Sequence, residues 1–201
     1  MLDNPFREKL ATISDPLIAV YRFLRLTPNK ITVAGLVIAC AAAYATSLRH
    51  PYWALSLWWF SRLLDGTDGI YARSTNQTSD FGAYLDIVCD MAAYSVMILG
   101  FSIPYPHLQI AWSTILILYV LCITSALSLG SLTEKRGFVS TDNRGLRLGA
   151  GLAEGGETGV AYTFFLLMPQ HIETLTTAWL IILGFTVAAR TMLANRLFYK
   201  Q

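Results

Sequence analysis

Four aspartates that lie within 26 residues are the part of this sequence best suited to chemistry. Asp65 and Asp68 are three residues apart, and Asp86 and Asp90 are four apart, so on helices each pair would share one face. The surrounding sequence is strongly apolar. An ionised carboxylate at membrane depth is costly unless it is paired or bound to a metal, so such residues mark a functional site by default. Segment 65–90 is therefore the predicted active site.

Two helix faces that each carry two carboxylates could hold hard divalent cations. Mg²⁺ and Mn²⁺ prefer oxygen ligands and are usually bound by a few carboxylates together with water and substrate phosphates. Arg73 adds a permanent, forked cation that suits a phosphate group. Glycines at Gly66, Gly69 and Gly82 would let a ligand approach the backbone. This combination predicts a phosphate or pyrophosphate substrate and a metal-assisted displacement at phosphorus.

A purely structural explanation of the aspartates, through helix caps and salt bridges, is the alternative. Asp65 could pair with Arg62, for example. Caps lie at helix ends, however, whereas Asp86 and Asp90 repeat in phase with Gly82 along one helix face. The in-phase stripe favours a site.

Transmembrane helices are the elements that must position these residues. Of 201 residues, 54% are hydrophobic and 14% are charged, against about 25% charged in ordinary soluble domains. Apolar runs close to the ~20 residues needed to cross a bilayer recur along the chain. The predicted fold class is an all-α polytopic membrane protein. Its six transmembrane helices are predicted at about 27–46, 51–73, 81–103, 108–132, 146–168 and 172–198.

Residues 1–26 are predicted to form an amphipathic juxtamembrane segment that lies in the interface, because apolar and basic side chains recur there at helical intervals. The same stretch is charged and contains Pro5 and Pro16, so we expect no cleavable signal peptide. Residues 27–201 are predicted to form one six-helix membrane domain, since no long polar linker interrupts them.

The basic residues predict the orientation in the membrane. If the amino terminus is cytoplasmic, every Lys and Arg except Arg49 lies on the cytoplasmic side or in the cytoplasmic end of a span. That bias puts both termini and the aspartates on the cytoplasmic side of the cell (inner) membrane. The three histidines fall on the opposite side, which makes a mechanism based on histidine a poor fit.

The aspartate segment resembles the signature of the class I CDP-alcohol phosphotransferases, also called CDP-alcohol phosphatidyltransferases. All eight fixed positions match, and no position departs from the pattern. The residues that carry the resemblance are Asp65-x2-Asp68-Gly69-x2-Ala72-Arg73-x8-Gly82-x3-Asp86-x3-Asp90.

This resemblance implies an enzyme that moves a substituted phosphoryl group from a CDP-alcohol lipid donor, CDP-diacylglycerol, to the hydroxyl of a small alcohol and releases CMP. It further implies phospholipid biosynthesis, a homodimer and two ions of Mg²⁺ or Mn²⁺. By position, Asp90 would also be the general base. The implied metal ligands are Asp65, Asp68, Asp86 and Asp90. The residues implied to line the CDP site are Asn29, Thr32, Gly69, Ala72, Arg73, Ser79 and Gly82.

Residues for the acceptor alcohol are expected in the second half of the chain. Basic side chains near the cytoplasmic side could hold an anionic acceptor, although positive-inside topology and contacts with lipid headgroups explain a basic loop equally well. The basic candidates are Lys135, Arg144, Arg147 and Arg190. Glu154 and Glu157 would share one face of a glycine-rich helix and could bind hydroxyls or an ammonium group.

The glycine-rich stretch is similar to a Glu-Arg-x-Glu-Arg pattern in family members that use phosphorylated acceptors. Here Gly155 and Thr158 stand in place of the two arginines. This difference favours a neutral or amino alcohol over a phosphorylated polyol such as glycerol phosphate or inositol phosphate, which is the alternative acceptor.

Two other classes of function compete with a transferase. Carboxylates within a membrane also line ion paths, so a divalent-cation transporter is one alternative. After Asp90 the third predicted span continues as Met91-Ala92-Ala93, which offers no polar path across the bilayer. A non-catalytic membrane scaffold is the other alternative, and it would not need the complete motif.

Overall fold

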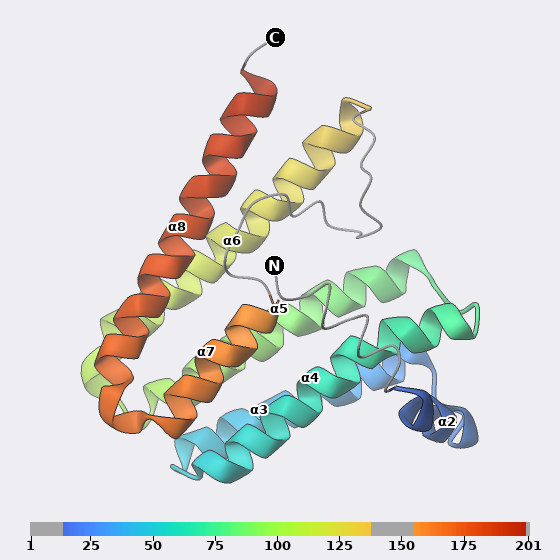
Figure 1. The fold of residues 1–201 in the computed structure, drawn as a ribbon, viewed down its shortest axis with the longest axis horizontal. Coiled ribbons are helices and arrows are strands. Elements are labelled where there is room, and N and C mark those ends of the chain that lie inside the picture. Colours follow the sequence, from blue (N-terminus) through green and yellow to red (C-terminus); the bar gives the residue numbers. More distant parts are fainter. Residues whose placement is uncertain (1–13, 138–154, 200–201) are drawn as a thin grey trace.

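The computed structural model describes residues 14–137 and 155–199, and every regular element in these two ranges is helical (Figure 1). The chain starts with the short helix α2 (Asp15–Phe23), followed by α3 (Pro28–Ser47), α4 (Pro51–Ser74) and α5 (Asp80–Ser102). The 3₁₀ turn η1 (Pro106–Leu108) leads into α6 (Gln109–Lys135). The remaining elements are α7 (Gly155–Leu167), the 3₁₀ turn η2 (Pro169–His171) and α8 (Ile172–Phe198).

Local sequence explains where the long helices begin. Pro28 and Pro51 occupy the first turns of α3 and α4, where a missing amide proton costs no helical hydrogen bond. Ser79 caps α5 by accepting a hydrogen bond from the backbone N–H of Gly82 at 3.0 Å.

Five of the predicted spans correspond to helices with similar bounds: 27–46, 51–73, 81–103, 108–132 and 172–198. The predicted start of the span at 146–168 lies outside the described residues.

Four helical segments in the described ranges are long and apolar enough to cross a membrane: Pro28–Ser47, Asp80–Ser102, Pro106–Lys135 and Pro169–Phe198. Helix α4 has 24 residues, but its second half contains three charged side chains, two of which are its aspartates. Helix α7 has 13 residues in the described part of the chain. The protein is thus an all-helical membrane protein, and the polar character of α4 comes from the candidate site.

Small residues allow α3 to pack tightly against α4 and α5. Ser61 of α4 donates its hydroxyl hydrogen bond to the backbone carbonyl of Gly35 at 2.8 Å. On α5, a Cβ atom added to Gly100 would lie 2.6 Å from the carbonyl oxygen of Ala43, which is closer than real carbon contacts. Such close approach is typical of helix pairs in membranes, where packing replaces the hydrophobic effect as the driving force.

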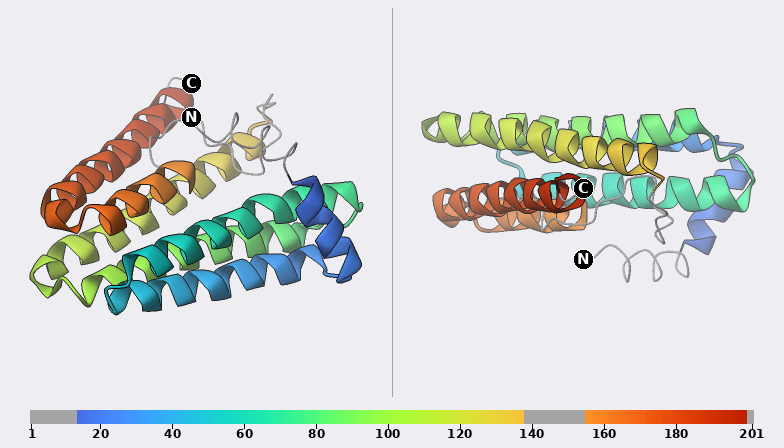
Figure 2. Two further views of the ribbon diagram at one scale, coloured as in Figure 1. Left: turned by 60° about the horizontal axis from the view of Figure 1, so that its bottom comes forward. Right: turned by 90° about the horizontal axis from the view of Figure 1, so that it is seen from above.

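Buried hydrogen bonds join α8, α6 and α7 to α5. Trp179 Nε1 donates to the Tyr119 hydroxyl at 3.0 Å, and the Tyr119 and Tyr162 hydroxyls lie 2.8 Å apart. Tyr162 in turn donates to the backbone carbonyl of Tyr94 at 2.8 Å. Figure 2 shows α6 and α8 running side by side, at an angle to the group formed by α3, α4 and α5. The hydrogen-bonded chain therefore fixes this second group of helices against α5.

Helix α2 lies at the end of the bundle where α4 and α5 are connected (Figure 1). Its Tyr21 hydroxyl is 2.9 Å from Thr67 Oγ1 of α4, and Tyr71 of α4 donates to the carbonyl of Leu26 at 3.1 Å. Burial raises the pKa of the Tyr21 phenol, so the hydroxyl stays protonated at neutral pH. Phe23 on the other face is 86% exposed. The described part of the predicted juxtamembrane segment thus has one buried and one exposed apolar face.

Candidate active site

The four aspartates lie on the two helices that meet at the turn between α4 and α5. Asp65 and Asp68 are on α4, and Asp86 and Asp90 are on α5. Asp65 interacts electrostatically with both Asp86 and Asp90, and Asp68 interacts with Asp90. The structure therefore brings together the two pairs that the spacing predicted to act as one group.

Arg62 of α4 lies between carboxylates of the two helices. Its guanidinium donates to Asp90 Oδ1 and lies 3.6 Å from Asp65 Oδ2. The same group stacks over the rings of Trp58 and Tyr94, with Cζ at 4.8 and 5.3 Å from the ring centroids. From the sequence, we predicted no role for Arg62 beyond a possible salt bridge with Asp65. Its position three residues before Asp65, on the same helix face, is the signal that could have identified it.

Asp68 is the most enclosed of the four aspartates, with 5% of its surface exposed. Thr32 of α3 donates its hydroxyl hydrogen bond to Asp68 Oδ2, and the same hydroxyl lies 3.2 Å from the carbonyl of Pro28. The predicted CDP-site residue Thr32 therefore contacts an aspartate of the motif directly.

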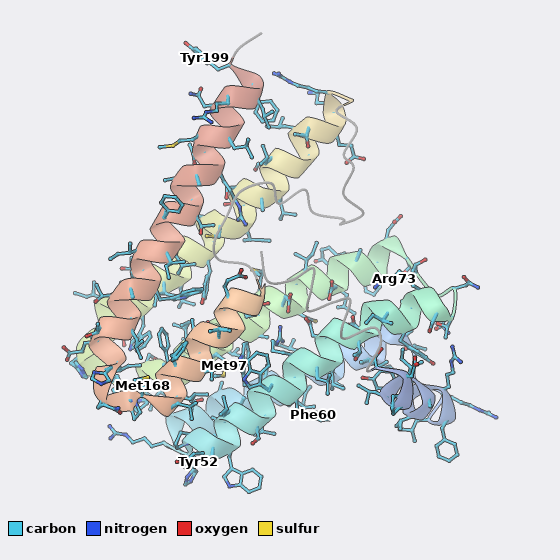
Figure 3. The ribbon with its side chains drawn as sticks, viewed as in Figure 1. Tyr52, Phe60, Arg73, Met97, Met168 and Tyr199 are labelled. Atoms are coloured by element: carbon cyan, nitrogen blue, oxygen red, sulfur yellow. The ribbon has the colours of Figure 1, made fainter. Side chains whose placement is uncertain are left out.

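The other residues predicted to line the CDP site gather at the same end of the bundle. A Cβ atom on Gly82 would lie 3.2 Å from Ser79 Oγ and 3.3 Å from Asn29 Oδ1, so these three residues are neighbours. A Cβ atom on Gly69 would lie 3.4 Å from a guanidinium nitrogen of Arg73. Figure 3 shows Arg73 near the end of α4, beside the turn that leads to α5. Ala72 is buried one residue before it. The glycines thus leave space for polar side chains to converge.

The residues predicted to bind the acceptor are spread more widely. Arg190 of α8 is 4% exposed and donates to the carbonyl of Cys122 on α6 at 2.7 Å. Lys135 is exposed at the end of α6, and Glu157 lies in the first turn of α7. Arg144, Arg147 and Glu154 lie outside the described residues.

The start of α7 lies against α5, one turn beyond Asp90. A Cβ atom on Gly155 would lie 2.8 Å from the Tyr94 hydroxyl oxygen, so Tyr94 would have to move to admit any side chain there. This contact gives a physical reason for glycine at a position where the resembling pattern has arginine. It also brings the helix of Glu157 close to the helix of Asp86 and Asp90.

The donor atoms suit a divalent cation, although the carboxylates do not form a closed ligand set. Within residues 14–137 and 155–199, no group of three or more His, Cys, Asp or Glu side chains is arranged to hold a metal ion. The available donors are carboxylate oxygens, which Mg²⁺ and Mn²⁺ prefer. A positive charge already lies between Asp65 and Asp90, in the form of the Arg62 guanidinium. The chemistry of the site therefore fits a cation held by carboxylates from both helices.

Comparison with known proteins gives consistent matches. The family model described as CDP-alcohol phosphatidyltransferase matches residues 25–189. The chain is 30% identical over 176 residues to the Escherichia coli inner membrane protein YnjF, covering 84% of this chain and 83% of that protein. It is 28% identical over 136 residues to the CDP-diacylglycerol–inositol 3-phosphatidyltransferase of Candida albicans, covering 66% of this chain but 59% of the length of that enzyme.

The solved structures of Mycobacterium tuberculosis phosphatidylinositol phosphate synthase have a similar fold. The structure with bound CDP-DAG has a TM-score of 0.66 at 18% identity and covers 90% of this chain and 92% of that chain. A second structure of that synthase, in complex with manganese and citrate, has a TM-score of 0.61 at 19% identity and covers 89% and 87%. At such identities the likeness concerns the fold. The family match over most of the chain confirms the resemblance found in the aspartate segment: the protein belongs to the CDP-alcohol phosphatidyltransferase family.

Proposed function

We propose that this protein transfers a phosphatidyl group from a CDP-alcohol, CDP-diacylglycerol, to the hydroxyl of a small alcohol and releases CMP. The observation that carries the proposal is the arrangement of Asp65, Asp68, Asp86 and Asp90, which face one another from α4 and α5 inside the region that matches the family. Family membership alone is compatible with many related substrates, so the chemistry of these side chains must distinguish among them.

The donor's diphosphate would lie against the aspartates and the nearby cation Arg73. The small residues Gly69 and Gly82 leave room for the nucleotide next to the backbone, and Asn29 and Ser79 offer polar atoms beside Gly82. Thr32 keeps Asp68 oriented through its hydrogen bond. Two ions of Mg²⁺ or Mn²⁺, held by the four aspartates, would neutralise the diphosphate and stabilise charge that develops at phosphorus.

Asp90 is the proposed general base, because it lies on the α5 face next to the start of α7, where the acceptor would enter. Its role is to accept the proton of the acceptor hydroxyl as the oxygen bonds to phosphorus and the bond to CMP breaks. An ordinary aspartate is a weak base for an alcohol, so correct placement must supply much of the rate.

The membrane arrangement that suits this reaction has six transmembrane helices, α3 to α8, and an interfacial helix before them. Both termini and the aspartates would lie on the cytoplasmic side of the cell (inner) membrane. A lipid tail could then stay in the bilayer while the CDP head reaches the polar end of α4 and α5. We further propose a homodimer, as the family resemblance implies.

A neutral or amino alcohol is the proposed acceptor. Position 155, which is packed against Tyr94, holds a glycine, so no arginine side chain is available there to bind a phosphate. Arg190 already donates a hydrogen bond to the backbone of α6. Glu157 near the start of α7 suits hydroxyl or ammonium groups. A phosphorylated polyol is the second candidate. The fold resembles that of a phosphatidylinositol phosphate synthase, and the basic side chain of Lys135 is exposed at the end of α6.

The decisive experiment is to incubate the purified full chain with CDP-diacylglycerol, Mn²⁺ or Mg²⁺ and a panel of alcohols, with and without a phosphate group. The expected result is release of CMP together with a phospholipid of matching mass, and no release when EDTA removes the cations. Metal flux into protein-loaded vesicles without nucleotide, and no turnover with any alcohol, would instead support the transporter.

Replacing the proposed base provides the first mutational prediction. Asp90→Asn should lower kcat by about 10²- to 10⁴-fold, which is the typical contribution of a general base. Asp80→Asn, in the first turn of the same helix, is the matched control and should keep most of the activity. Wild-type turnover by Asp90→Asn, measured as CMP release, would reject the role of Asp90.

A further inference from the structure

Arg62 makes a set of contacts that the proposed reaction does not explain. Its side chain is 10% exposed and bridges Asp65, on its own helix, to Asp90 on α5. The pair formed by Arg62 and Asp90 joins α4 to α5. The positive charge thus lies where the carboxylates of the two helices face each other.

The surroundings of Arg62 hold the guanidinium firmly in place. Trp58 and Tyr94 present their ring faces to it, at 4.8 and 5.3 Å from Cζ. A second guanidinium nitrogen donates to Ser61 Oγ at 3.0 Å. Contacts between cations and aromatic rings strengthen when water is excluded, as it is here. These contacts come from neighbouring turns of α4 and from α5, so the cation has a built site of its own.

One buried polar atom of Arg62 remains unsatisfied. Its Nε lies out of contact with water and has no hydrogen-bond partner. An unsatisfied buried donor is unfavourable. The hydrogen bond to Asp90 and the contact with Asp65 offset that cost.

We infer that Arg62 is a positioning residue that holds Asp65 and Asp90 together while the site contains no divalent cation, and gives up these carboxylates when a cation binds. The inference rests on the proposed function, since it takes the aspartates to be cation ligands. Without a positive charge between them, carboxylates of facing helices would repel each other in a medium of low dielectric constant. A divalent cation and a fixed guanidinium would also repel each other, so the two compete for the same oxygens.

The competition predicts a specific effect on cation affinity. Mn²⁺ binding to the full chain in detergent can be measured by electron paramagnetic resonance, without nucleotide or alcohol. Arg62→Gln should bind Mn²⁺ about tenfold more tightly than the wild type, because a repelling unit charge is removed. Arg62→Lys keeps the charge and should bind Mn²⁺ like the wild type. Arg49→Gln is the matched control, because Arg49 also stacks on an aromatic ring, that of Tyr105, at the other end of α5.

Thermal unfolding separates this role from simple packing. Arg62→Gln should lower Tm without metal and should show a larger increase of Tm on adding Mn²⁺ than the wild type, because binding to the folded state raises Tm. A merely structural Arg62 would lower Tm equally with and without Mn²⁺ and would leave Mn²⁺ affinity unchanged. Either of those results would overturn the inference.

A measurement on the wild type covers the case in which Arg62→Gln does not fold. Phenylglyoxal modifies accessible arginines, and peptide mass spectrometry reports each site, with exposed Arg73 as the internal reference. Saturating Mn²⁺ should raise modification of Arg62 several-fold relative to Arg73, and an unchanged ratio would reject the release of Arg62. Since none of these three measurements needs turnover, a failure to release CMP would reject the proposed enzyme without deciding the role of Arg62.

Discussion

The hydroxyl of Thr32 shows how a single side chain outside the aspartate segment supports the site. It donates to Asp68, which is enclosed between α3 and α4. A buried carboxylate needs such donors to stay ionised and correctly turned. We therefore expect Thr32 of α3 to support the site by orienting the Asp68 carboxylate.

Removing this hydroxyl should weaken the use of metal. Thr32→Val keeps the shape of the side chain, and we expect the Mn²⁺ concentration for half-maximal CMP release to rise about tenfold, as for other residues that orient metal ligands. The control is Thr46→Val on the same helix, because buried Thr46 donates only to the carbonyl of Ala42. Equal Mn²⁺ requirements in the two variants would show that Thr32 does not orient Asp68.

At the scale of elements, α3 is the helix that holds α4 and α5 in register. Ser61 of α4 hydrogen-bonds to its backbone at Gly35, and Gly100 of α5 lies close to its backbone at Ala43. Its amino-terminal end brings Thr32 to Asp68 and Asn29 to Gly82. Any change that separates α3 from α5 should therefore affect stability and the site together.

Gly100 provides a direct test of this packing. In Gly100→Ala the new methyl group would meet the backbone of Ala43, which cannot rotate away, and we expect a loss of about 1–3 kcal/mol in unfolding free energy. The matched control is Gly130→Ala on α6, where nothing lies within 4 Å and the higher helix propensity of alanine should leave Tm unchanged or raise it. Thermal unfolding in detergent measures both, and equal Tm values would contradict the close approach.

The helices and the aspartate group were predictable from sequence, whereas their cross-helix partners were not. Prolines at helix starts and apolar runs of bilayer length fix where helices begin and end, and the regular spacing of the aspartates fixes which face they share. Spacing along one helix carries no information on how two helices cross. The pairing of Arg62 with Asp90 and the burial of Arg190 against Cys122 depend on that crossing.

On the scale of the whole molecule, the charges and helices predict which end faces the cytoplasm. Helix α5 has 23 residues, enough to cross a bilayer at about 1.5 Å per residue. The turn between α4 and α5 lies at one end of it and η1 lies at the other. Labelling both ends can therefore determine the orientation.

Cysteine labelling tests this orientation. In a chain whose own cysteines are replaced, His107→Cys in η1 should react with a membrane-impermeant maleimide on intact cells, because His107 is exposed at the end predicted to face outward. Gln77→Cys, exposed between α4 and α5, should react only after the cells are opened. The reverse pattern would place the aspartates on the outer side and remove access to cytoplasmic CDP-lipid.

The contact between Gly155 and the Tyr94 hydroxyl also links these two positions in any attempt to change the acceptor. An arginine at position 155 would meet the Tyr94 hydroxyl, so the tyrosine side chain would have to move or be replaced by a smaller one. We therefore expect Gly155→Arg to need a second substitution at Tyr94 before its guanidinium could bind a phosphate group.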